Sequence, residues 1–319
     1  MEDRLLPVNA MLCLLLPNDA ATPVLDRAGF RLAGLEIPAQ ARTGSVVIDS
    51  VLVHGASNHL VLGESKSGRN IEADQARKYA EVTPQDVVQV AFIGTKRTTP
   101  FTREILYLCL KEHSTGIRTG LNAASLDYPI MSVSDDGVEL EGAHTAGDEL
   151  QKAFAGGRVE FTGPPARLIP FDHESDVSIV KPYVLSALVA EMSHKTTQLT
   201  LTLLAERATP HYALYGRKAR GQLLNKVREA VRLIVQDSPT SFEFVPHNGD
   251  RDAIVRILRT PESYHPRGRT QAYKAIGRPR AGRRRRIDPN ADQLDLLLEL
   301  GIVEEPSDDP GDEPDEVSA

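Results

Sequence analysis

A glutamate and a lysine two residues apart follow a short apolar run in the first quarter of the chain. The run covers residues 60–63, and Glu64, Ser65 and Lys66 come directly after it. Because side chains two apart in a strand lie on the same face of a sheet, Glu64 and Lys66 are expected to point together. An acid and a base held at the end of a buried strand indicate chemistry, whereas the alternative is a strand that runs out into solvent.

A second acid precedes this pair. Residues 45–54 are rich in β-branched side chains and predict a strand that contains Asp49. A turn then leads into the returning strand, and the resulting hairpin would bring Asp49 beside Glu64. Two neighbouring carboxylates repel, and a divalent cation relieves that repulsion. Mg²⁺ prefers hard oxygen ligands and keeps several waters, so Asp49, Glu64 and the main-chain carbonyl of Ser65 are predicted to hold it, with Mn²⁺ able to substitute.

The chemistry that such a cation would support is hydrolysis of a phosphodiester. The cation would polarise a phosphoryl oxygen and lower the pKa of a bound water. Lys66 alongside would orient the water and offset the charge that builds on the phosphate. Asp and Glu side chains titrate at about pH 4 in water, so both acids would be ionised ligands at neutral pH.

This order of residues resembles the PD-(D/E)XK nuclease superfamily, whose core is αβββαβ. In that superfamily an acid lies on the second strand and an E-x-K motif on the third. Here the acid is Asp49, preceded by Ile48 where proline is usual, and E-x-K is Glu64-Ser65-Lys66. The resemblance implies a restriction-endonuclease-like fold and a metal-dependent deoxyribonuclease.

A further motif lies on the helix predicted over residues 71–82. Gln75 and Tyr79 form Q-x-x-x-Y, which marks the RecB-like and lambda-exonuclease-like branch, and their spacing puts both on one helix face. The resemblance covers about residues 18–110 and implies that both side chains lie beside the active site and contact the DNA backbone. The upstream histidine that some members use as a metal ligand has no clear counterpart. Glu36 is a candidate for an extra acid near the metal.

The elements around these motifs predict a mixed α/β sheet of modest size. A hairpin around Asp-Asp-Gly and a short helix extend it, so the nuclease-like domain is expected to span residues 1–175. The expected helices cover residues 18–30, 71–82 and 147–157, and the expected strands cover residues 31–38, 45–54, 59–66, 85–94 and 103–112, with the hairpin at 130–142.

The second half predicts a mainly helical domain over residues 176–262. Helical patterns at 181–192, 196–207 and 211–236 precede two strands around an Asn-Gly-Asp turn, which is the chain order of a winged helix. Such a domain would bind DNA or a partner. A basic helix face that is merely solvated is the alternative. The residues predicted to contact DNA are Arg217, Lys218, Arg220, Arg228, Arg251 and Arg256.

Charge is unevenly spread along the last part of the chain. Residues 264–287 hold nine bases and no acid, whereas residues 302–319 hold eight acids and no base. The net charge of −7 therefore becomes about +1 without the last segment. Residues 263–319 are predicted to be a basic linker and a disordered acidic tail that could dock a protein partner.

Cysteine and hydropathy patterns favour a cytoplasmic protein with no membrane partner. Cys13 and Cys109 lie in apolar runs, as buried reduced thiols do. No apolar stretch approaches the roughly 20 residues that cross a bilayer. The run at 10–17 lacks a basic segment before it and is closed by Pro17, so core is favoured over a signal peptide.

Histidine gives no metal signal, because His113, His173 and His194 lack ligand spacing and are interpreted as surface or loop residues. The leading hypothesis is a Mg²⁺-dependent DNA nuclease of bacterial defence, restriction or repair, dimeric if it cuts both strands together. The alternatives are a non-catalytic DNA-binding regulator that retains the fold, and an interaction subunit. Strand preference, end dependence and sequence specificity stay open.

Overall fold

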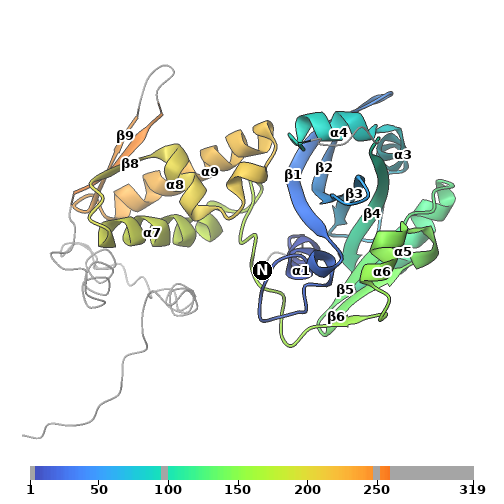
Figure 1. Ribbon diagram of the computed structural model, residues 1–319. Coiled ribbons are helices and arrows are strands. Elements are labelled where there is room, and N and C mark those ends of the chain that lie inside the picture. The colour runs from blue at the N-terminus through green and yellow to red at the C-terminus, as the bar shows by residue number, and fades with distance from the viewer. Residues whose placement is uncertain (1–3, 95–99, 247–251, 259–319) are drawn as a thin grey trace, which may run out of the picture. The chain divides into compact units, whose positions relative to one another are not determined.

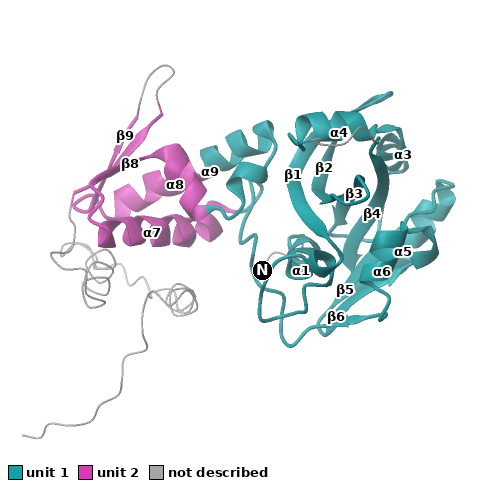
Figure 2. Ribbon diagram, in the orientation of Figure 1, with its two compact units in different colours: residues 1–175, 209–226 teal, residues 176–208, 227–319 magenta. Residues whose placement is uncertain are grey.

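A computed structural model describes residues 4–94, 100–246 and 252–258 of the chain (Figure 1). The chain divides into two compact units, one of residues 1–175 with 209–226 and the other of residues 176–208 with 227–319 (Figure 2). Residues 209–226, which the sequence placed with the second domain, thus pack with the first unit. Arg251 and the predicted linker and tail lie outside the described residues.

The first unit is built on a seven-stranded mixed sheet in which the strands follow one another in chain order. Strands β3 and β4 pair in parallel, as do β4 and β5, and every other neighbouring pair is antiparallel. The prediction of a mixed α/β fold is confirmed. The strands are β1 (Phe30–Ala41), β2 (Gly44–His54), β3 (His59–Lys66), β4 (Thr102–Leu110), β5 (Ile130–Ser134), β6 (Gly137–Glu141) and β7 (Val159–Glu160).

Helices cover both faces of the central strands. Tyr79, Val87 and Ile117, from three different helices, join one apolar cluster with strand residues such as Leu62. The N-terminal helix contacts β3, β4 and β5, which fits the near-continuous apolar character of β4. The helices of this unit are α1 (Leu6–Cys13), α2 (Val24–Arg27), α3 (Ala73–Glu81), α4 (Pro84–Val90), α5 (Lys111–Ala123), α6 (Asp148–Ala153) and the first half of α9 (Arg217–Asp237), with 3₁₀ turns η1 (Ala143–Thr145) and η2 (Tyr212–Leu214).

The start of the chain differs from the sequence prediction. The helix expected over residues 18–30 is wrong, because only α2 is helical there. The strand expected to stop at Pro38 instead continues to Ala41, with Pro38 opposite Val47. Proline cannot donate to a sheet ladder, but β1 comes first in the strand order and is an edge strand, where proline is tolerated.

The strand expected over residues 85–94 is also wrong, because this segment forms α4. Thr83 caps the helix by accepting a hydrogen bond from the Asp86 amide at 3.2 Å, and Pro84 occupies the first turn. A short apolar run fits a strand or a buried helix equally well, so the capping residues carried the better signal. Helices α1 and α5 were not predicted either.

The second unit contains helices and a small antiparallel sheet with strand order β8-β10-β9. Helices lie in each of the three predicted helical segments, and the two predicted strands pair with each other. Residues 198–200, predicted as helix, instead pair with the last strand. Its elements are α7 (Val177–Ser193), β8 (Gln198–Thr200), α8 (Leu201–Ala208), the second half of α9 (Arg217–Asp237), β9 (Phe242–Val245) and β10 (Ile254–Ile257).

Two further expectations concern cysteines and membranes. Cys13 and Cys109 are both buried free thiols, as the sequence predicted. Within the described ranges, none of the helices combines the length and the apolar character needed to cross a bilayer.

Candidate active site at the end of strand β3

The β2–β3 hairpin brings the two predicted acids together. Its pairing runs from His54 opposite His59 to Ser50 opposite Gly63, so one step further puts Asp49 across from Glu64. The Ser65 amide donates a hydrogen bond to Asp49 Oδ2 at 2.6 Å. The hairpin register therefore fixes Asp49 against the residue that follows Glu64.

Glu64 is almost fully buried, with 3% of its surface exposed, and both of its oxygens are engaged. Lys66 Nζ lies 2.7 Å from Oε1, and the Tyr79 hydroxyl contacts Oε2. The same hydroxyl lies 2.5 Å from the Val47 carbonyl oxygen. A buried carboxylate is stable only when it is paired and hydrogen-bonded, and these contacts meet that need.

Helix α3 supplies the groups that hold the E-x-K motif. Gln75 Oε1 accepts a hydrogen bond from Lys66 Nζ at 2.9 Å, while Tyr79, one turn later, contacts Glu64. The spacing of four residues puts both side chains on the helix face that packs toward the sheet. The structure thus brings together all five residues to which the sequence gave a catalytic role, the fifth being Asp49.

Like charge accumulates at Asp49. Burial raises its pKa well above the ordinary value, and the nearby Glu64 carboxylate raises it further. The Ser65 amide and Lys66 act in the opposite direction, and Glu36 adds a smaller upward effect. The acids at this point outnumber the one lysine, so the negative charge is incompletely offset.

Glu36 lies in β1 at the position across from Asp49, between the pairs Leu35–Ser50 and Ile37–Ile48. Its φ of 46° is left-handed, which is uncommon for a residue with a side chain. Such a backbone costs on the order of 1 kcal/mol and persists where the surroundings impose it, often beside active sites.

His173 contacts Glu36, which the sequence gave no means to foresee. Its Nδ1 forms an ion pair with Glu36 Oε2 at 3.0 Å, and this interaction raises the pKa of His173 against the lowering effect of burial. His173 lies in a loop, as the sequence predicted. The chain separation from Glu36 leaves no local pattern for this contact.

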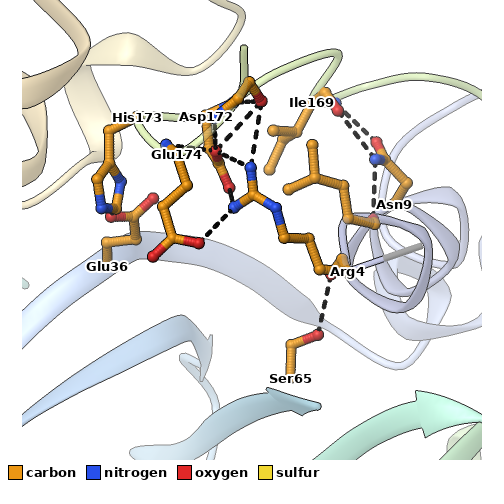
Figure 3. A network of polar contacts seen from close by, with 10 residues as sticks. Arg4, Asn9, Glu36, Ser65, Ile169, Asp172, His173 and Glu174 are labelled. Atoms are coloured by element: carbon orange, nitrogen blue, oxygen red, sulfur yellow. Dashed lines mark hydrogen bonds and ion pairs between the residues drawn. The ribbon is translucent and has the colours of Figure 1, made fainter. Parts of the chain in front are cut away.

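Arg4 forms ion pairs with the two residues that flank His173 in its loop (Figure 3). Its guanidinium contacts both oxygens of Asp172, one at 2.6 Å, and lies 2.9 Å from Glu174 Oε2. The Arg4 carbonyl also accepts a hydrogen bond from Ser65 Oγ at 3.4 Å. The N-terminal segment therefore joins the loop to the residue between Glu64 and Lys66.

A cavity of about 430 Å³ opens beside these groups. Its volume lies in the range of pockets that hold small ligands, about 300–1,000 Å³. Glu64, Lys66 and Tyr79 do not line it. The charged and polar residues that line it include Glu36, Asp49, Ser65, Gln75, His173 and Lys218.

The residues predicted to bind DNA fall in both units. Arg217, Lys218 and Arg220 belong to the first unit, and Arg217 and Lys218 are exposed. Arg228 and Arg256 belong to the second, where Arg256 Nη1 lies 3.1 Å from Glu243 Oε2. That ion pair reduces the charge that Arg256 could offer to a phosphate.

Few oxygen atoms at this place could hold a metal ion. Across residues 4–94, 100–246 and 252–258, no three His, Cys, Asp or Glu side chains gather closely enough to enclose a metal by themselves. A cation at this place would thus depend on Asp49, Glu64, main-chain oxygen and water. Comparisons with protein-family models, with curated proteins and with solved structures give no match, so the function has to be argued from this site.

Proposed function

We propose that the protein is a Mg²⁺-dependent DNA nuclease that hydrolyses phosphodiester bonds. The observation that carries the proposal is the pairing of Asp49 and Glu64 beside one lysine, Lys66, next to a cavity. Gln75 and Tyr79 hold the lysine and the glutamate from one helix. These are the positions that the resemblance to PD-(D/E)XK nucleases assigns to the active site.

The order of elements supports the same proposal. A helix precedes β1, β2 and β3, helices α3 and α4 follow, and β4 then pairs in parallel with β3. This agrees with the αβββαβ order of restriction-endonuclease-like cores. The acid on the second strand and E-x-K at the end of the third occupy the places that this order requires.

The donor set fits a hard divalent cation. Asp49, Glu64 and the Ser65 carbonyl offer only oxygen, and Mg²⁺ in proteins often takes one or two carboxylates and completes its shell with water. Burial raises the pKa of Asp49, the nearby Glu64 carboxylate raises it further, and a bound cation would favour the ionised form of both acids. When bound there, Mg²⁺ or Mn²⁺ would supply Lewis-acid polarisation of a phosphoryl oxygen and a lowered pKa for water.

The chain's own residues position the reaction. Lys66, held between Glu64 Oε1 and Gln75 Oε1, can donate a proton of its ammonium group to a phosphate oxygen or orient a water. Tyr79 prevents Glu64 from turning away from Asp49. Positioning of this kind matters because a misplacement of about 1 Å can cost about 10²-fold in rate.

The second unit supports a role in substrate or partner binding. Three helices and a sheet of order β8-β10-β9 agree with a winged-helix-like arrangement, in which a helix enters a DNA groove and the hairpin lies on the backbone. We place the enzyme in the cytoplasm, in bacterial defence, restriction or repair. A homodimer would cut both strands, and the acidic tail could bind a partner.

A non-catalytic DNA-binding regulator is the second candidate. The observation that favours it is the engagement of both Glu64 oxygens by Lys66 and Tyr79, which could satisfy a purely structural acid. The two candidates differ in one respect. A metal site requires Lys66 or Tyr79 to share Glu64 with a cation, whereas a structural pair does not bind one.

Cleavage assays test the proposal directly. Wild-type protein and its Glu64→Gln and Lys66→Ala variants are incubated with supercoiled plasmid or linear DNA, in Mg²⁺, Mn²⁺ or chelator. We expect metal-dependent cutting that falls on the order of 10³-fold or more in both variants, equivalent to several kcal/mol of lost stabilisation. Cutting of linear but not circular DNA would show that ends are required.

Glu104→Gln is the matched control, because the Glu104 side chain is also paired and only 9% exposed, but it lies on β4 beside the first half of β3. It should cut at close to the wild-type rate. An equal loss in Glu104→Gln and Glu64→Gln would mean that folding explains both. Wild-type protein that binds DNA, cuts nothing and gains no thermal stability from Mg²⁺ or Mn²⁺ would favour the regulator.

A further inference from the structure

The start of helix α9 forms part of the cavity that Asp49 lines. Lys218, Ala219 and Gln222 lie on its first two turns and all three line the wall. Lys218 and Gln222 are four residues apart and hence neighbours on one helix face. A cation and an amide are therefore presented together to the space beside the acids.

Strand β1 fixes the place where α9 begins. The Gly216 amide donates a hydrogen bond to the Leu35 carbonyl at 2.8 Å, and Tyr215 forms an isolated parallel bridge with Leu35. A Cβ at Gly216 would lie 2.3 Å from the Glu36 carbonyl oxygen, so only glycine allows this approach. The docking point is the same strand segment that holds Glu36 across from Asp49.

The positive charge of Lys218 is not neutralised by an ion pair within the described residues. In the part of the chain that the structure describes, no carboxylate forms an ion pair with its ammonium group, whereas Arg4 in the same cavity is paired with Asp172 and Glu174. The acids Glu36 and Asp49 on the same cavity would repel a phosphate. An uncompensated lysine beside them lowers that repulsion.

We propose that Lys218 and Gln222 bind a backbone phosphate of the DNA strand whose neighbouring bond is cut, an inference that rests on the proposed nuclease function. Lysine binds phosphate as a point charge with three donors, and the glutamine amide adds two more. Lys218 thus acts inside the cavity of the first unit, where the sequence had assigned it to duplex contact by a second domain. It is a positioning residue, since it touches a phosphate next to the reacting one.

A salt titration of DNA binding tests the charge contact. Lys218→Gln removes the ammonium group, and Arg42→Gln is the control for loss of one positive charge, because the Arg42 side chain is 86% exposed and does not line the cavity. Binding of a single-stranded oligonucleotide is measured in chelator at several salt concentrations. We expect Lys218→Gln to weaken binding about 5- to 10-fold and to flatten the slope of log affinity against log salt by about 0.7.

A methylphosphonate scan locates the phosphate. Oligonucleotides that carry one neutral methylphosphonate at successive positions are tested with wild-type protein, Lys218→Gln and Gln222→Ala. A methylphosphonate at one position should weaken binding by wild-type protein and leave binding by Lys218→Gln unchanged. At the same position, the methylphosphonate should weaken binding by Gln222→Ala less than it weakens binding by wild-type protein. Additive losses at every position, or equal effects of Lys218→Gln and Arg42→Gln, would overturn the inference.

Failure of this inference differs from failure of the nuclease proposal. Metal-dependent cutting with unchanged binding in Lys218→Gln would remove the phosphate contact and keep the nuclease. A methylphosphonate signal at one position without any cutting would keep the contact and remove the nuclease. Wild-type protein that neither binds nor cuts DNA would remove both.

Discussion

Acidic side chains lie near both ends of strand β3, yet their surroundings differ. At the start of the strand, Glu104 of the neighbouring strand accepts the Gly147 amide at 2.7 Å and lies 2.8 Å from His59 Nε2. Thr102 Oγ1 completes the group at 2.8 Å from His59 Nδ1. At the end of the strand, Glu64 and Asp49 share one lysine.

The difference lies in how well charge is balanced. One acid meets one histidine and one amide at the start of β3, and every polar atom named there has a partner. At the other end, burial raises the pKa of Asp49 beside a cavity, and the carboxylates of Glu64 and Glu36 raise it further. Protein stability alone gives no reason to place several acids together in a buried position, so this arrangement is consistent with the proposed cation site.

Replacing one acid at each end should change stability in opposite directions. Glu104→Gln turns an acceptor into a donor that faces either His59 or the Gly147 amide, and we expect the free energy of unfolding to fall by about 1–3 kcal/mol. Asp49→Asn keeps an oxygen for the Ser65 amide but removes the repelled charge. We expect it to raise the free energy of unfolding at neutral pH, measured by denaturant titration in chelator.

The sign for Asp49 follows from the direction of its pKa shift. The folded-state pKa is raised, so the folded protein favours the protonated acid and wild-type stability declines as pH rises from about 4 through that pKa. Asp49→Asn should lack this decline. Mg²⁺ should stabilise wild-type protein but not Asp49→Asn. A loss of stability in Asp49→Asn at neutral pH would contradict the view that charge is in surplus there.

Gly63 comes directly before Glu64 in β3, and its replacement tests how rigidly the strand holds Glu64. A Cβ at this position would lie 2.2 Å from Ser50 Oγ and 3.5 Å from Leu108 Cδ1. Overpacking of this kind costs about 1–3 kcal/mol, so we expect Gly63→Ala to lower the free energy of unfolding by that amount and to lower the cleavage rate.

Gly68→Ala is the control, because nothing lies within 4 Å of a Cβ at that exposed position. Its free energy of unfolding should stay within about 0.5 kcal/mol of the wild-type value. Equal stability of the two alanine variants would show that the strand adapts easily and that Gly63 does not enforce the geometry of Glu64.

The sequence revealed those parts of the site whose spacing is local. Glu64 and Lys66 are two apart, Gln75 and Tyr79 are four apart, and a hairpin joins Asp49 to Glu64, so strand and helix periods suffice. Periodicity was less useful where one segment fits two structures. The apolar residues 85–94 fit a strand as well as α4, and only Thr83 and Asp86 marked the helix start.

Contacts between distant segments left no trace in the sequence. Arg4 contacts Asp172, and His173 contacts Glu36, although more than a hundred residues separate the partners in the sequence. Helix α5 was missed for a related reason. Gly116 and Gly120 weaken its helical pattern, yet a Cβ at either would lie 2.7 Å from Arg69 or Ile71, so tertiary packing requires the glycines.

The smallest expected effect concerns the ion pair between His173 and Glu36. Its contact raises the pKa of His173, so the folded protein favours the charged imidazole. The stabilisation is therefore complete below the unfolded-state pKa of about 6.5 and is lost as pH rises through the folded-state pKa. His173→Gln should lower the free energy of unfolding by about 1 kcal/mol or less at pH 6, because both side chains are partly exposed, and by less at pH 9.

His144→Gln is the control, because this side chain is 78% exposed, and it should change the free energy of unfolding at neither pH. If the difference in free energy of unfolding between His173→Gln and wild-type protein were the same at both pH values, Glu36 would not stabilise a charged imidazole. The negative charge around Asp49 would then be larger than the contacts indicate.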